Sequence, residues 1–293
     1  MTLITQTLAT GILLAGLYSI FALGLSLQWG LLHTINFAHF GFVFLTAYIT
    51  YEIATTFGLD PLVAVVVTGP VGALLGIALQ VFITRFKIDV FGSLIVTFAL
   101  FLIFEAGMTM RWTSDLVRIP LDQNPYFIKA LRFGPFTLPL TGVIALVAAL
   151  LACGGVWWLL NRTHAGKGMR AFVQDPEMAS AFGVNYPRLA MLVAAISGAA
   201  AGVTGTLVGM LFVLTPTGAE IWIAVIFAVV LLGGLANPLG VIGAALIIGL
   251  VESFTRQFAD PALARLMALV VLAVVLIFRP GGLFKPIVEE ARE

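Results

Sequence analysis

Residues 7–51 read TLATGILLAGLYSIFALGLSLQWGLLHTINFAHFGFVFLTAYITY and contain no Asp, Glu, Lys or Arg. A helix needs about 20 mainly apolar residues to cross the hydrocarbon core of a bilayer. The block is long enough for roughly two crossings. The polar residues near its middle, at 28–34, predict the join between them. This stretch alone therefore predicts a membrane-spanning, helical fold.

The composition of the whole chain agrees with this interpretation. Hydrophobic residues make up 61% of the 293 residues and charged residues 10%, with a mean hydropathy of +1.10. A soluble domain usually carries about 25% charged residues, so this chain could not cover its surface in water. The formal net charge of +1 offers no large basic surface, which argues against nucleic acid as a partner. The single cysteine, Cys153, cannot form an internal disulfide.

Further apolar segments follow the first block. We expect crossings at residues 62–84, 91–110, 138–160, 189–214 and 263–278. Residues 221–251 also carry no charge but are interrupted by GGLANPLG at 233–240, so they form either two short crossings or a re-entrant pair of half-helices. The predicted fold is all-α: a polytopic membrane protein with about eight or nine transmembrane helices, some short or broken. No polar segment is long enough for a separate domain, so residues 1–293 are read as one transmembrane domain.

Basic residues near the ends of the crossings predict the orientation, because they are enriched on the cytoplasmic side. Alternation places nine on one side: Arg85, Lys87, Arg162, Lys167, Arg170, Arg188, Arg279, Lys285 and Arg292. Six fall on the other: Arg111, Arg118, Lys129, Arg132, Arg256 and Arg265. The modest excess predicts that the first side is cytoplasmic. The C-terminus is then cytoplasmic, and the N-terminus is periplasmic if the first block makes two full crossings.

Motifs for catalysis and cofactor binding are absent from the sequence. The string nearest to a P-loop, Ala165-Gly166-Lys167-Gly168, lacks the upstream glycine and the hydroxyl after the lysine. His33 and His39 are six residues apart, which is not the spacing that places two ligands on one helical face. We therefore expect no enzyme activity, no metal and no directly bound cofactor.

The polar segment 161–186 reads NRTHAGKGMRAFVQDPEMASAFGVNY. Asp175 is a candidate N-cap, Pro176 fits the first helical position, and Glu177 adds a favourable charge near the helix N-terminus. Gly183 is a candidate C-cap. The segment therefore predicts a short amphipathic helix over 176–182 at the cytoplasmic face. From local physics alone, an ordinary well-capped loop is the alternative interpretation.

This segment resembles the cytoplasmic coupling loop of the branched-chain amino acid ABC permeases. The family pattern T-x-x-G-x-x-x-R-A-x-x-x-(D/N)-x-x-x-A-x-x-x-G-(I/V)-(N/D) is matched in step, ending at Val184 and Asn185. The resemblance implies that residues 161–188 couple the permease to an ATPase, with the short helix docked in a groove of the nucleotide-binding subunit. The residues implied in this role are Thr163, Gly166, Arg170, Ala171, Asp175, Pro176, Glu177, Ala179, Gly183 and Asn185.

Two further segments resemble signatures of the same family. Residues 24–48 match its N-F-A-H motif at positions 36–39, but Phe40 and Thr46 stand where small residues are usual. Residues 233–254 match its glycine-rich signature, with Ala236 in place of a glycine and Val241 in place of a small residue. Residues 279–284 resemble its C-terminal R-P-x-G-L-F motif.

Polar groups and broken backbone at membrane depth either line a pathway or tie helices together, and both interpretations stay open for these segments. The candidate pathway or helix-interface residues are Asn36, Phe37, His39, Gly233, Gly234, Asn237, Pro238, Gly240, Gly243 and Glu252. Glu105 also lies in an apolar segment, close to its expected periplasmic end.

The resemblance implies a permease subunit of a binding-protein-dependent importer in the bacterial inner membrane, for branched-chain amino acids or related small solutes. Its implied partners are a second homologous permease, two cytoplasmic ATPase subunits that carry ATP and Mg, a periplasmic solute-binding protein and the lipid bilayer. The alternative is an ion-coupled secondary transporter, which would require an intramembrane acidic pair or ion cage.

Overall fold

The computed structural model describes residues 2–133, 136–279 and 281–284. Pro280, Lys285 and Arg292, which entered the C-terminal motif and the charge comparison, lie outside this part of the chain. Within it, eight helical segments are long and apolar enough to cross a membrane. They are α1 (Thr2–Leu32), α2 (Ala38–Phe57), α3 (Val65–Arg85), α4 (Val90–Trp112), α6 (Leu140–Arg162), α9 (Tyr186–Leu211), η1 with α10 (Pro216–Ala219 and Glu220–Gly233) and α11 (Pro238–Phe258). The shorter apolar helix α12 covers Ala264–Phe278. The predicted all-α membrane fold is confirmed.

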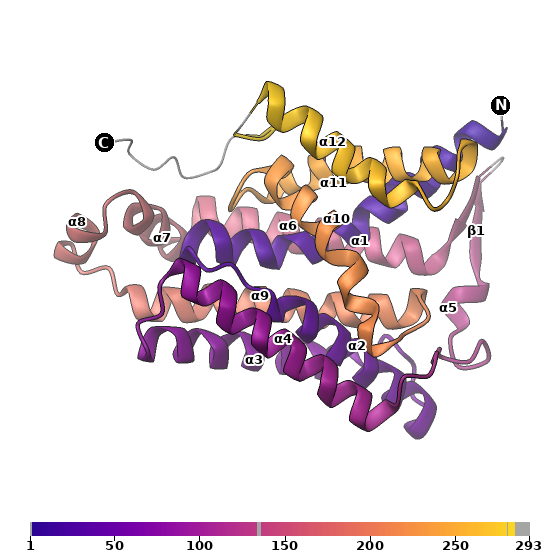
Figure 1. The fold of residues 1–293 in the computed structure, drawn as a ribbon, viewed down its shortest axis with the longest axis horizontal. Helices are drawn as coiled ribbons and strands as arrows, with labels where there is room; N and C mark the ends of the chain where they lie inside the picture. The colour runs from indigo at the N-terminus through magenta and orange to yellow at the C-terminus, as the bar shows by residue number, and fades with distance from the viewer. Residues whose placement is uncertain (1, 134–135, 280, 285–293) are drawn as a thin grey trace.

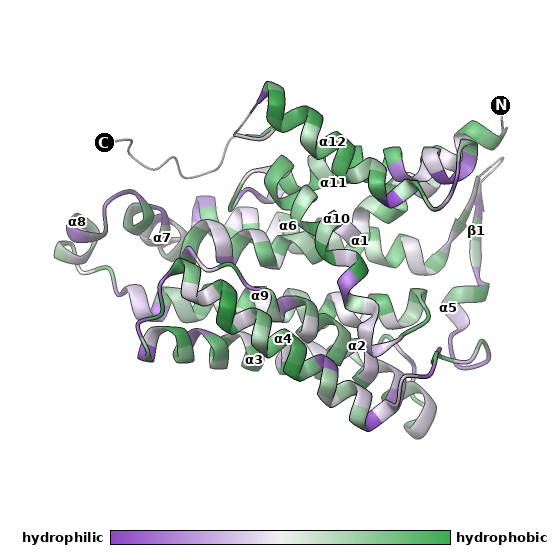
Figure 2. Ribbon diagram, in the orientation of Figure 1, coloured by the Kyte–Doolittle hydropathy of each residue, from purple (hydrophilic) through white to green (hydrophobic). Residues whose placement is uncertain are grey.

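The remaining elements lie at the two ends of the bundle. Helices α7 (His164–Gln174) and α8 (Pro176–Ala181) project from one end, and α5 (Pro125–Ile128) with strand β1 (Ala130–Phe133) lies at the opposite end (Figure 1). Figure 2 shows hydrophobic colour along the long helices and hydrophilic colour concentrated at these two ends. The arrangement places the predicted cytoplasmic segment 161–188 and the predicted periplasmic segment 111–137 on opposite sides of the apolar layer.

Helix α1 is the centre of the bundle. It contacts α6, α9, α10 and α11, and residues 15–28 are all buried. A charge inside this segment would need a partner on a neighbouring helix, because an ion buried away from water is costly. The absence of charge in the first block therefore reflects both the membrane and the position of α1 inside the protein.

Glycines allow the helices to approach closely. Gly72 on α3 faces Gly198 on α9, and a Cβ on either residue would overlap the backbone oxygen of the other. Gly202 on α9 is packed in the same way against the backbone of Thr68 on α3. Helices inside a bilayer gain no hydrophobic driving force for association. Small residues let their backbones approach closely, and the resulting van der Waals contacts hold the helices together. The contacts set the register of α3 against α9.

The first charge-free block breaks between α1 and α2, close to the predicted join. His33 has a left-handed backbone (φ 52°), and residues 33–36 are not helical. Side chains of α4 satisfy this irregular backbone. Ser93 Oγ accepts from the Ile35 N–H at 3.3 Å, and Thr97 Oγ1 accepts from the Phe37 N–H at 3.1 Å and donates to the Ile35 carbonyl at 2.9 Å. The broken backbone is thereby paired, as it must be away from water.

The segment over residues 221–251 resolves into the two consecutive helices α10 and α11, and α11 continues through the charged residues to Phe258. The sequence did not predict the small sheet in the polar segment after α4. There β1 pairs antiparallel with β2 (Phe136–Pro139), with Ala130 opposite Pro139. Gln6 of α1 holds the sheet in place, because its Nε2 donates to the Thr137 carbonyl at 2.7 Å and its Oε1 accepts from the Thr137 N–H at 3.0 Å.

Candidate functional site

Three N-cap hydrogen bonds and one left-handed glycine define the ends of the helices in the projection formed by α7 and α8. Thr163 Oγ1 accepts from the Gly166 N–H at 3.2 Å at the start of α7, and Asp175 Oδ1 accepts from the Met178 N–H at 2.9 Å at the start of α8. Gly183 has a left-handed backbone (φ 82°) just after α8. Asn185 Oδ1 accepts from the Arg188 N–H at 3.2 Å at the start of α9. The predicted short helix is present with its predicted caps, and it ends at Ala181, one residue earlier than expected.

Three contacts tie the projection to the bundle. The rings of Phe172 on α7 and Tyr186 on α9 stack with centroids 3.9 Å apart. Arg170 Nη1 donates to Asn161 Oδ1 at 3.3 Å, which links α7 to the last turn of α6. Gly166 is packed directly against the backbone oxygens of α6, where a Cβ would overlap them. A displacement of α7–α8 would therefore be transmitted to both α6 and α9.

The two faces of α8 differ sharply. Ala179 is 5% exposed and packs inside the projection, whereas Met178 is 56% exposed and Phe182, just after the helix, is 82% exposed. The large apolar side chains that are exposed to a partner here are therefore Met178 and Phe182, which the sequence did not single out. The available signal was their spacing of four residues, which places two apolar side chains on one face of a short polar helix.

The polar residues of the 24–48 signature meet inside the bundle. Asn36 Nδ2 donates to Gln28 Oε1, and Asn36 Oδ1 accepts from the His39 N–H at 3.1 Å. His39 Nε2 lies 3.1 Å from the Phe21 carbonyl on α1, and His39 Nδ1 has no hydrogen-bond partner within the described residues. Asn36 and His39 are completely buried, so both tie α2 to α1, whereas Phe37 is only half-buried.

The structure shows the contacts made by Phe40 and Thr46, the two residues at which the 24–48 segment departs from the family pattern. Phe40 is fully buried and stacks on Phe227 of α10 at 6.1 Å, so an aromatic contact stands where a glycine would allow closer helix approach. Gly41 instead faces the ring of Phe104 on α4. Thr46 Oγ1 donates within α2, and Gly205 of α9 packs against it.

Residues 233–240 form a turn that packs against α1, and hydrogen bonds satisfy backbone polar groups of this turn. Gly234 has φ 78° and Ala236 has φ 55°, both left-handed. The Ala236 N–H donates to the Ser26 carbonyl at 3.2 Å, and Asn237 Oδ1 accepts from the Gly240 N–H at 3.0 Å as the N-cap of α11, with Pro238 at the first helical position. These contacts satisfy the broken backbone.

The remaining glycines of this signature are packing positions. Gly233 and Gly240 face each other, and a Cβ on Gly240 would overlap the Gly233 oxygen. Gly243 lies under the ring of Phe284. The structure therefore places these three glycines at contacts within the chain.

Glu252 lies far from this turn, in the second half of α11. It is completely buried, accepts a hydrogen bond from the Tyr18 hydroxyl of α1 and pairs with Arg256 one turn further along α11. It is 14 residues from Pro238, roughly 21 Å along the helix. The candidate residues thus occupy three separate places: the α1–α2 break, the α10–α11 turn and this buried ion pair.

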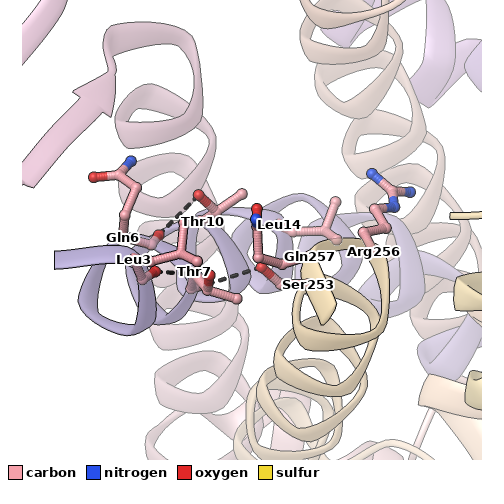
Figure 3. Close-up of a pocket in the computed structure, with 8 residues that line it drawn as sticks. All are labelled: Leu3, Gln6, Thr7, Thr10, Leu14, Ser253, Arg256 and Gln257. Atoms are coloured by element: carbon pink, nitrogen blue, oxygen red, sulfur yellow. Dashed lines mark hydrogen bonds between the residues drawn. The ribbon is translucent and has the colours of Figure 1, made fainter. Parts of the chain in front are cut away.

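A small pocket lies beside that pair, between α1 and α11 (Figure 3). Its volume is about 130 Å³, and Thr7, Thr10, Ser253 and Arg256 are among its lining residues. Ser253 Oγ donates to the Thr7 carbonyl at 2.8 Å and joins its two walls. Pockets that enclose small molecules usually measure about 300–1,000 Å³, so this one is too small for such a role.

The comparisons with known proteins agree with this architecture. Residues 7–278 match the family model described as a branched-chain amino acid transport system permease component. The chain belongs to this family, whose members are membrane permeases. No solved structure matches.

Similar proteins include the probable branched-chain amino acid transport permease LivH of Methanocaldococcus jannaschii, 26% identical over 93% of this chain and 90% of the relative. The high-affinity branched-chain amino acid permease BraD of Pseudomonas aeruginosa is 25% identical over 97% of each chain. The fructose import permease FrcC of Rhizobium meliloti is 28% identical over 94% of this chain and 82% of the relative. These matches do not favour the ion-coupled alternative.

Proposed function

We propose that this chain is the membrane-spanning subunit of a binding-protein-dependent ABC importer in the bacterial inner membrane. Its cargo would be branched-chain amino acids or related small solutes, as the names of two similar permeases suggest. A further similar protein is named as a fructose import permease, so sequence similarity does not by itself restrict the cargo to amino acids. Selectivity would therefore lie largely in a periplasmic solute-binding protein.

Energy would come from partner subunits, because this sequence contains no P-loop. The observation that supports this most directly is the α7–α8 projection, which exposes Met178 and Phe182 at one end of the bundle (Figure 1). Two cytoplasmic ATPases with ATP and Mg would receive this projection, one on each of two related permeases. Closure of the ATPases would move α7–α8 as a rigid body and shift the spans between outward-open and inward-open states.

The test is a tagged purification of this chain from cells that also express its chromosomal neighbours, in mild detergent, with the partners identified by mass spectrometry. We expect ATPase chains and a second permease, and a co-encoded binding protein whose ligand can then be screened. A homo-oligomer that lacks any ATPase would contradict the proposal.

A further inference from the structure

Four aromatic side chains from separate elements meet on one outer face of the bundle, between α4 and α10. Phe37, in the α1–α2 break, lies 5.7 Å from Phe98 of α4 and 5.2 Å from Phe227 of α10, measured between ring centroids. Trp29 of α1 lies 5.8 Å from Phe227. Phe98 is 43% exposed and the other three are half-buried, so this aromatic patch is open to whatever lies outside the chain.

The backbone beneath the patch is irregular and runs inward from the end of α1, where the Thr34 N–H donates to the Gln28 carbonyl at 3.3 Å. His39, two residues after Phe37, contacts the Phe21 carbonyl, which is 11 residues before the end of α1, or roughly 16 Å along the helix. His33 is exposed and Ile35 is half-buried, so the break is not fully covered by the rest of the chain. Irregular backbone at membrane depth is tolerated against protein or water but not against lipid.

Carboxylates lie on the same face. Glu105 follows Phe98 by seven residues on α4, and Glu220 precedes Phe227 by seven residues on α10. Seven residues are about two helical turns, so each carboxylate lies on the face of its phenylalanine and roughly 10 Å nearer the predicted periplasmic end. Helix α4 contacts η1, which ends immediately before Glu220, so the two carboxylates lie in the same region of the bundle.

Glu105 differs from the other carboxylates inside the spans. Glu52 pairs with Arg111 at 3.1 Å, and Glu252 pairs with Arg256 and Tyr18. Glu105 Oε2 is buried without a hydrogen-bond partner among the described residues. A carboxylate within a span is costly unless it is paired or hydrated, so the unpaired Glu105 indicates water or a polar partner at this site.

The middle of α3 and the middle of α12 lack both a backbone break and an ionisable side chain. Val270 in the middle of α12 is 47% exposed, and α12 contains no ionisable residue after Arg265. Leu74 in the middle of α3 is 65% exposed, and α3 contains none before Arg85. Both helices are unbroken, as is usual for surfaces in contact with lipid.

From this difference between the α4–α10 face and the faces of α3 and α12, we infer that the α4–α10 face lines the solute pathway. The aromatic patch forms its constriction and contacts an apolar side chain of the solute, while Glu105 and Glu220 at the periplasmic mouth attract its ammonium group. The inference rests on the proposed function, and it adds to it the face of the chain that the solute meets.

Single-cysteine labelling tests the inference. Cys153, the only native cysteine, is buried and is replaced by serine to give the background. Phe98→Cys is compared with Val270→Cys, because both positions lie eight residues from the predicted cytoplasmic ends of their helices and are similarly exposed. Leu74→Cys is a second control. The readout is the rate of modification by a charged methanethiosulfonate, measured on the assembled transporter in open membrane vesicles.

We expect Phe98→Cys to react at least about tenfold faster than both controls, because a thiol in lipid ionises poorly. Leucine at saturating concentration should slow the reaction at Phe98→Cys alone. Leu102→Cys, one turn further along α4 and 44% exposed, repeats the test if Phe98→Cys does not assemble.

Equal rates at Phe98→Cys, Leu102→Cys and Val270→Cys, in a complex that still contains its ATPase subunits, would overturn the pathway inference and leave the proposed function intact. If the proposed function itself is wrong, the result is different: the purified complex contains no ATPase subunits. The labelling ratio reports water access alone, so it still decides whether this face is open to water.

Discussion

Ala236 is held in a backbone conformation that side chains other than glycine disfavour. It stands where the family usually has glycine, and its φ of 55° explains that preference. Its N–H is bonded to Ser26 and its side chain is 1% exposed, so the turn between α10 and α11 cannot relax without losing its contact with α1. The strain of an L-residue in this region is about 1–2 kcal/mol.

Ala236→Gly should therefore change the free energy of unfolding little, within about 0.5 kcal/mol, because relief of strain offsets the loss of a buried methyl group. The control is Ala244→Gly, at a fully buried position inside α11. It should destabilise the protein by about 1.5 kcal/mol, since it removes a methyl group and adds backbone freedom without relieving strain. Thermal unfolding in detergent distinguishes the two, and equal losses would contradict the strained turn.

Two buried tyrosines provide a second comparison. The Tyr18 hydroxyl donates to the buried Glu252 carboxylate, whereas the Tyr48 hydroxyl is buried without a partner among the described residues. Tyr18→Phe should destabilise the protein by about 2 kcal/mol, the usual contribution of a hydrogen bond to a charged group. Tyr48→Phe should be neutral or slightly stabilising. Denaturant titration measures both, and a harmless Tyr18→Phe would show that Arg256 alone satisfies Glu252.

The ends of helix α8 follow from its local sequence, but its orientation does not. Its start at Asp175 and Pro176 and its stop at Gly183 follow from capping, which depends only on neighbours in the chain. Which side of α8 faces outward depends on how it folds back onto α7. An arginine at the buried position Ala179 would therefore disrupt the projection itself as well as any surface that docks on it.

A substitution of the exposed residue Phe182, just after α8, tests the docking role without disturbing the inside of the projection. Phe182→Asp should leave the protein folded, because Phe182 is 82% exposed, and should reduce co-purification of the ATPase at least about tenfold, as expected for an aromatic anchor. Phe57→Asp is the matched control, since Phe57 is 70% exposed at the end of α2. Normal ATPase binding and normal uptake by Phe182→Asp would argue against docking at this face.

For the whole molecule, the proposed function requires one orientation in the membrane. With cysteines introduced into the Cys153→Ser background, Asp122→Cys should react with an impermeant thiol reagent in spheroplasts, whereas Ala181→Cys should react only after permeabilisation. Both positions are exposed, and they lie in the segments at opposite ends of the bundle. The reverse pattern would place α7–α8 outside the cell and exclude contact with a cytoplasmic ATPase.

The membrane class, the approximate positions of the spans, the caps of α8 and the resemblance that the family match confirmed could all be read from the sequence. These features depend on composition and on neighbours in the chain, which a single sequence displays directly. The small β1–β2 sheet was missed because its four-residue strands contain too few positions to show a period.

Which side chains meet could be learned only from the folded arrangement of the helices. Tyr18 and Glu252 are 234 residues apart, and Trp29, Phe37, Phe98 and Phe227 come from four elements. In a bilayer, helix faces toward lipid and toward protein are both apolar, so hydrophobic periodicity cannot separate them. Backbone contacts at glycines, such as Gly72 against Gly198, set how the helices are rotated and aligned, and thereby bring these distant residues together.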